Sequence, residues 1–138
     1  MAAAGADFGT HSHSHVALTG LDDTRLRQEL HTSRALLEDT VGKTVDSLSY
    51  PFGRVDQRVI DAAAEAGYTR AYTMRFGHPD DPPLALGRAA VYGFDTPLSV
   101  VCKLRPGPMQ AVERAKNWTA NKLSGGTVLL NRLRGTNR

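Results

Sequence analysis

The chain has 138 residues and a formal net charge of +3, with 41% of its residues hydrophobic and 22% charged. That length suits one domain with a core, and that composition excludes a wholly disordered chain. No apolar run approaches the roughly 18 residues that a membrane-spanning helix needs. The first residues lack the basic and long apolar regions of a secretory signal. As written, the sequence therefore predicts a cytoplasmic protein without a transmembrane segment.

The first informative segment, Phe8 to His15, contains three of the five histidines of the chain. Imidazole is the commonest side-chain ligand of transition metals, so the segment predicts a metal site. On a strand, alternation would place His11, His13 and His15 on one face, an arrangement that binds catalytic zinc. In a turn or at a helix start, His11 and His15 would share a face while His13 would point elsewhere. The spacing by itself leaves both geometries open.

The next segments alternate between helix and strand signals. A helix is expected to begin near Asp22, which suits an N-cap, and to end at Gly42, which suits a left-handed cap. Hydrophobic spacing and proline or glycine punctuation predict the elements that follow: a strand over 44–49, a turn over 50–53, a helix over 56–66, a strand over 68–74, a loop over 78–83 and a strand over 84–92. This order is typical of an α/β protein with a parallel sheet.

The C-terminal part is predicted to be helical and basic. Thr96 suits the N-cap of one helix, with a proline at its first position. A second helix is expected over 109–123, with its inward face formed by Ala111, Ala115 and Trp118. From residue 103 onward Glu113 is the only acid. Such a segment could contact nucleic acid or an anionic membrane, but it lacks a stacking pattern of aromatics, so a solvated charged helix face is favoured and no nucleic acid is expected.

With these residues in view, the chain resembles the polysaccharide deacetylase family, the NodB-homology group of carbohydrate esterases. The segment Phe8 to His15, followed by Leu18 and Leu21, is similar to the family's His-Ser/Thr-x-x-His motif. The segment Ser49 to Gly53 resembles the family's third motif, and the Ala-Gly-Tyr sequence at 66–68 resembles the start of the strand that follows it. The likeness extends over residues 7–105.

The resemblance implies a role for particular residues. It makes His11 and His15 the two metal-binding histidines and His13 a variable position, which favours the turn geometry. The cofactor implied is a divalent metal, most often zinc, which polarises the acetamide carbonyl and activates a water. The turn Tyr50, Pro51, Phe52 and Gly53 would line the substrate groove. The backbone N–H of Phe52 would donate to the oxyanion.

Two departures from the family pattern shape the fold and function expected. The family's first motif, which supplies an aspartate ligand and the catalytic base, lies upstream of the histidines. Here Asp7 is the only acidic residue before His11. The base is therefore expected to be absent, and His78 is a poor match to the family's late general acid. The expected fold is α/β, a partial or distorted (β/α) barrel of the polysaccharide deacetylase type with its N-terminal strands missing. Residues 1–105 would form this truncated domain and 106–138 a basic helix and tail.

The leading functional hypothesis is a metal-dependent hydrolase that removes N-acetyl groups from a polysaccharide or oligosaccharide, impaired by loss of the catalytic aspartates. A location at the cell envelope would follow if the true N-terminus lies further upstream. The alternative is a non-catalytic carbohydrate-binding or scaffold remnant. A further reading is a metal-binding protein that uses His11, His13 and His15 together. The sequence does not define the sugar or the oligomeric state.

Overall fold

The structure is a computed structural model that describes residues 5–105 and 107–133, with side chains as far as residue 120. The chain divides into two compact units. The first unit comprises Met1–Thr73 and His78–Leu86, and the second comprises Met74–Gly77 and Gly87–Arg138. The domain boundary predicted between residues 105 and 106 marks where the family resemblance ends, and the division into compact units does not test it. That boundary stays a prediction. Within the described ranges, no helix has both the length and the apolar character needed to cross a bilayer.

The first unit is organised around short parallel strands. β1 (Ser47–Ser49) pairs in parallel with β2 (Arg70–Tyr72), and Leu48 lies opposite Ala71. A single parallel bridge joins Thr10 to the outer side of β1 at Leu48. Thr10 donates its N–H to the Ser47 carbonyl at 2.9 Å. The predicted α/β organisation with parallel pairing is confirmed, although both strands are shorter than expected.

The strand predicted over 84–92 is wrong. Pro83–Ala85 forms a short 3-10 turn, and only Leu86 makes a parallel bridge, to Tyr72. Proline at 82 and 83 fixes the backbone torsion and removes two hydrogen-bond donors, which favours a turn at this point. Beyond Leu86 the backbone to residue 92 is irregular.

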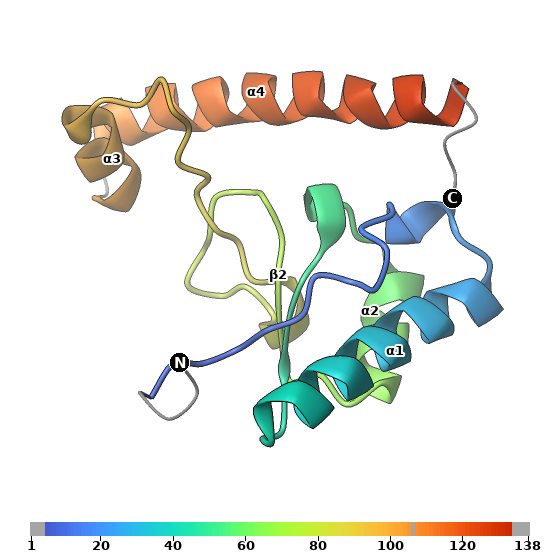
Figure 1. The fold of residues 1–138 in the computed structure, drawn as a ribbon. Coiled ribbons are helices and arrows are strands. Elements are labelled where there is room, and N and C mark those ends of the chain that lie inside the picture. The colour runs from blue at the N-terminus through green and yellow to red at the C-terminus, as the bar shows by residue number, and fades with distance from the viewer. Residues whose placement is uncertain (1–4, 106, 134–138) are drawn as a thin grey trace. The chain divides into compact units, whose positions relative to one another are not determined.

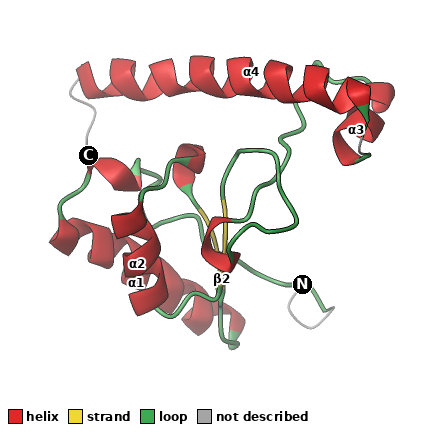
Figure 2. Cartoon of the chain, turned by 180° about the vertical axis from the view of Figure 1, so that it is seen from behind, coloured by secondary structure: helices red, strands yellow, loops and turns green. Residues whose placement is uncertain are grey.

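Two helices cover these strands. α1 (Asp23–Val41) begins where the Asp22 side chain accepts the Arg25 N–H at 2.9 Å, and it ends at Gly42 with a left-handed φ of 66°. α2 (Gln57–Glu65) begins in the same way at Asp56. Both predicted helices are confirmed, because their capping residues stand where the chain must satisfy free N–H and C=O groups. Figures 1 and 2 show α1 and α2 on the same side of β2.

The core of the first unit lies between these helices and the strands. Its large, fully buried members include Leu26 and Leu30 from α1 and Leu48 from β1. The remaining members come from the loops, α2 and β2: Leu18, Tyr50, Val59, Ala62, Ala63, Ala66, Tyr68 and Ala71. Small alanines on α2 allow the helix to approach the strands closely, so the short strands stay buried.

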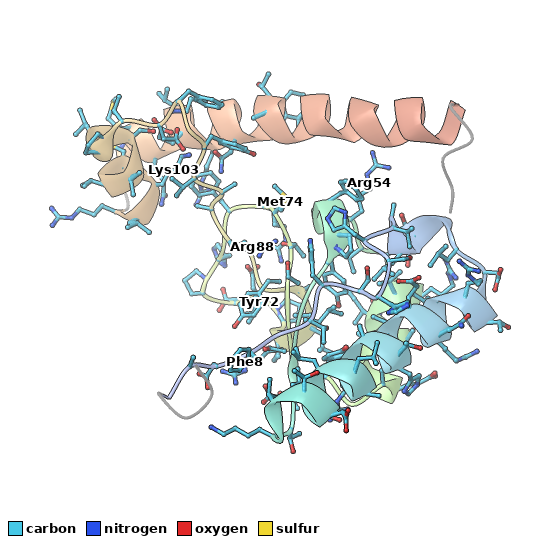
Figure 3. The ribbon with its side chains drawn as sticks, viewed as in Figure 1. Phe8, Arg54, Tyr72, Met74, Arg88 and Lys103 are labelled. Carbon is cyan, nitrogen blue, oxygen red and sulfur yellow. The ribbon has the colours of Figure 1, made fainter. Side chains whose placement is uncertain are left out.

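The second unit is built from two helices, α3 (Pro97–Leu104) and α4 (Pro108–Leu133). The Thr96 side chain caps α3 as predicted, accepting the Ser99 N–H at 3.2 Å. Figure 3 shows Lys103 at the junction of the two helices. α4 extends ten residues beyond the end predicted at 123.

The inward face predicted for the last helix is wrong. Ala111, Ala115 and Trp118 are exposed, whereas Glu113 and Asn117 are buried. The physical reason is the buried ammonium of Lys103 on α3, since a charge in a protein interior requires opposite charge beside it. α4 therefore turns its acid towards α3 and leaves its apolar side outward.

Candidate functional site

The histidine segment leaves the strand immediately after Thr10 and forms a turn. Ser12 and His15 have left-handed φ values of 61° and 56°. The Ser12 hydroxyl accepts the backbone N–H of His15 at 3.0 Å and holds the turn closed. Of the two geometries open from the spacing, the structure adopts the turn, and strand alternation of the three histidines is excluded.

The turn is held from below by Glu29 of α1, which is 4% exposed. Its carboxylate accepts the backbone N–H groups of His13 at 2.9 Å and Ser14 at 2.8 Å, together with the Ser14 hydroxyl. Burial raises the pKa of Glu29, but the hydrogen bonds from Ser14 and His13 outweigh it, so the pKa lies below the usual 4.5. The carboxylate is thus held ionised and fixes the path of the loop.

Sequence reasoning gave Glu29 no role in the site, although a signal was present. The buried face of α1 consists of Leu26, Glu29, Leu30 and Ser33, spaced as one helical stripe. An acid inside a buried stripe has to find hydrogen-bond donors, and the N–H groups of the nearby histidine turn supply them.

The turn brings His11 and His15 together. Their ring centroids lie 4.8 Å apart, and the His15 ring lies 4.9 Å from the ring of Phe52. The Nδ1 atom of His11 is 2.6 Å from the carbonyl oxygen of Ser49 in β1. A carbonyl only accepts hydrogen bonds, so Nδ1 carries the proton and the Nε2 lone pair of His11 is left available. The His13 side chain is exposed, and the contacts that hold this residue are those of its backbone.

The turn over 50–53 combines two left-handed residues, Phe52 with φ 58° and Gly53 with φ 63°. Such a φ is costly for a residue with a side chain and is typical of functional turns. No group in the described part of the chain accepts the N–H of Phe52, while the next N–H, that of Gly53, donates to the Tyr50 carbonyl at 2.9 Å. The backbone thus presents one free donor beside His15.

The predicted groove residues differ in their surroundings. Tyr50 is fully buried, and its hydroxyl donates to the Leu84 carbonyl at 2.8 Å. Burial raises the pKa of the Tyr50 hydroxyl well above its usual range. Pro51 is also buried, whereas Phe52 and Gly53 are half-buried. Their role in lining a substrate groove stays a prediction.

The imidazoles of His11 and His15 suit a divalent metal such as zinc, but they supply only part of a metal site. Two imidazoles, one of them oriented by a backbone carbonyl, are ordinary ligands for zinc. Across the described residues, no group of three or more His, Cys, Asp or Glu side chains is placed to bind a metal ion. His78 has a different partner, since its Nδ1 lies 3.3 Å from a carboxylate oxygen of Asp80. The remaining ligands would be water, substrate or groups outside this set.

A model of a known protein family matches the part of the chain that contains both turns. The family model described as polysaccharide deacetylase matches residues 1–71, which include the histidine turn and the turn at Phe52. This match extends over half of the sequence, and the chain belongs to the polysaccharide deacetylase family.

Individual proteins are similar to this chain in sequence or in fold. Chitin deacetylase 1 of Cryptococcus neoformans var. grubii is 35% identical over 65 residues, which are 47% of this chain and 14% of that protein. The Streptococcus pyogenes deacetylase PplD, solved in complex with acetate, superposes with a TM-score of 0.67 at 21% identity. A polysaccharide deacetylase from Bacillus cereus superposes with a TM-score of 0.62 at 25% identity.

The superpositions extend over more of this chain than of the relatives. They include 72% of this chain and 45% of the PplD chain, and 70% of this chain and 31% of the Bacillus cereus chain. This chain therefore spans less than half the length of these relatives. The superposed residues have the fold of a part of a polysaccharide deacetylase.

Proposed function

We propose that this chain binds a divalent metal, zinc, through His11 and His15 and takes part in the hydrolysis of N-acetyl groups on a sugar polymer. The observation that supports this proposal is the pairing of the two imidazoles at 4.8 Å between ring centroids, beside the free backbone donor of Phe52. Family membership supports the reaction class.

Each of these groups would contribute separately. When bound, a zinc ion polarises an acyl oxygen and lowers the pKa of a coordinated water. His11 would present Nε2, because its Nδ1–H is committed to the Ser49 carbonyl. The ring of Phe52 would limit the orientation of His15, and its N–H would donate to oxygen that becomes negative during acyl transfer.

We expect the chain by itself to be only weakly active. No third acidic or imidazole ligand accompanies His11 and His15 in the described residues. A missing general base lowers a rate by typically 10²–10⁴-fold. The parallel order of Thr10, β1, β2 and Leu86 is what a partial (β/α) barrel would contribute, with its remaining strands supplied by other sequence.

Release of acetate from chitooligosaccharides tests this function. We expect slow release that requires added zinc, stops with a chelator and is lost in His11→Ala and His15→Ala. His31→Ala is the matched control, because His31 is an exposed histidine on α1 outside the turn. Acetate release that persists in the chelator or in His11→Ala would contradict the proposal.

A second candidate is a carbohydrate-binding remnant without catalysis. The absence of a third ligand near the two histidines, within the part of the chain that is described, favours it. It predicts that the chain binds chitooligosaccharides with an affinity that a chelator leaves unchanged, and that no acetate appears. Measuring binding and acetate release in the same samples distinguishes the two functions.

A further inference from the structure

The second unit has charged side chains inside and apolar side chains outside. The side chains of Asp95 and Lys103 are almost fully buried and paired with each other. Lys116 lies 2.8 Å from the second carboxylate oxygen of Asp95 and 3.0 Å from Glu113. The exposed large apolar residues of this unit are Val91, Phe94, Leu98, Val101, Leu104, Met109, Val112 and Trp118. A helix pair in water ordinarily shows the opposite distribution.

Four of these exposed apolar residues lie in the helical turns on either side of the junction between α3 and α4. Leu104 ends α3 and is 74% exposed, and Met109 begins α4 and is 56% exposed. Val101 on α3 and Val112 on α4 each lie about one helical turn further from the junction. We call these four residues, Val101, Leu104, Met109 and Val112, the α3–α4 corner. They are held outward because Lys103 and Glu113, on the other sides of the same helices, are committed to the buried ion pairs.

The exposed charges of the second unit have one sign. The acids of the sequence from residue 87 onward are Asp95 and Glu113, and the side chains of both are buried in the ion pairs. The exposed charges described in this unit are all cationic: Arg75, Arg88, Arg105 and Arg114. Arg105 directly follows Leu104. Arg114 shares a face of α4 with Trp118, four residues on, and its guanidinium lies 5.7 Å from the ring of Phe76.

We propose that the α3–α4 corner docks on an anionic lipid surface, with its apolar side chains in the interfacial region and the neighbouring Arg105 and Arg114 on the headgroups. Apolar side chains bordered by arginine are the combination that binds such interfaces. The same charges oppose association with a second copy of this corner, since like charges would face each other. A nucleic acid would use the arginines but would leave the aliphatic side chains exposed to water. This inference does not depend on the proposed hydrolysis.

Vesicle binding by the full chain tests the proposal. Co-sedimentation is measured with vesicles of phosphatidylglycerol and phosphatidylcholine, and with vesicles of phosphatidylcholine alone. We expect binding to the anionic vesicles only, decreasing as salt is raised. Loss of two interfacial apolar side chains in Leu104→Ser/Met109→Ser should weaken binding by about tenfold or more. Leu36→Ser is the matched control, because Leu36 is an apolar residue of α1 that is 54% exposed.

A second measurement reports insertion directly. Trp118 is the only tryptophan of the chain, so Trp118→Phe/Met109→Trp moves the fluorophore to the corner. We expect its emission to shift to the blue with anionic vesicles and to become protected from an aqueous quencher. Circular dichroism establishes that each variant keeps its helices.

Three results would overturn the proposal. The first is equal vesicle binding by the Leu104→Ser/Met109→Ser and native chains. The second is salt-sensitive binding to a DNA oligonucleotide without binding to the anionic vesicles. The third is dimerisation in sedimentation velocity that the double substitution abolishes, with no vesicle binding by the native chain.

Discussion

Glu29 is a single buried carboxylate on which the position of the histidine turn depends. It accepts the N–H groups of His13 and Ser14, which lie in the turn and belong to no helix or strand. Without such an acceptor these N–H groups would be unpaired beside the core. The arrangement of His11 and His15 is therefore set by a residue that contacts neither ring.

Glu29→Gln should destabilise the first unit by about 1–3 kcal/mol at neutral pH. The substitution replaces a carboxylate, whose two oxygens only accept hydrogen bonds, by an amide whose NH2 group donates them. Glu65→Gln is the control, since Glu65 is an exposed member of an ion pair with Arg27. Denaturant unfolding followed by circular dichroism measures both. Equal stability of the two variants would contradict the role given to Glu29.

The same carboxylate predicts a pH dependence. The folded pKa of Glu29 lies below its usual value of 4.5, so its contribution to stability is complete above that pH and is lost as the pH falls through the folded pKa. The native chain should lose more stability than Glu29→Gln between pH 5 and pH 3. A difference between the two chains that is constant over this range would oppose the assignment.

At the scale of elements, the contact between α1 and the strands is partly polar. The Tyr68 hydroxyl accepts from the Thr10 hydroxyl at 2.8 Å and donates to the Leu30 carbonyl of α1 at 3.1 Å. All three residues are buried. One phenol therefore connects the start of the histidine segment, α1 and the start of β2.

Tyr68→Phe should cost about 1–3 kcal/mol, because the Thr10 hydroxyl would remain buried without its acceptor. Tyr72→Phe is the matched control, since no hydrogen bond of the Tyr72 hydroxyl occurs in the described residues. Unfolding free energies give the comparison. We also expect weaker zinc binding in Tyr68→Phe only, because Thr10 adjoins His11. A cost in Tyr72→Phe as large as in Tyr68→Phe would contradict this reasoning.

At the scale of the whole molecule, two units are stabilised by different interactions. The first has an apolar core, and the second depends on Asp95 between Lys103 and Lys116. Hydrogen bonds from Lys103, and then from Lys116, hold the pKa of Asp95 well below its usual value of 3.8. Since that pKa is depressed, the stabilisation is present above pH 3.8 and fades only in stronger acid.

Asp95→Asn should disorder the second unit selectively, because it leaves the buried Lys103 without its anion. We expect loss of helical circular dichroism and faster proteolysis within residues 91–120, while the first unit keeps its protection in hydrogen exchange. Asp39→Asn, at an exposed position of α1, serves as the control. Loss of protection in the first unit at the same rate would show that the two units unfold together.

The sequence was most informative where local chemistry decides the structure. The aspartate N-caps of α1 and α2 and the left-handed Gly42 could be predicted because each satisfies groups at a helix end. The orientation of α4 could not, since spacing identifies a face without showing what it packs against. Lys103 on another helix decided that Trp118 is exposed. The link from Glu29 to the histidine turn likewise depends on tertiary contact.

The central claim, that His11 and His15 form a metal-binding pair, is tested most directly by zinc calorimetry on the native chain and three single variants. We expect His11→Ala and His15→Ala to abolish binding and His13→Ala to retain it. Loss of binding in His13→Ala to the same extent would favour a site of three histidines. No binding by the native chain, or binding unaffected in His11→Ala and His15→Ala, would contradict the account.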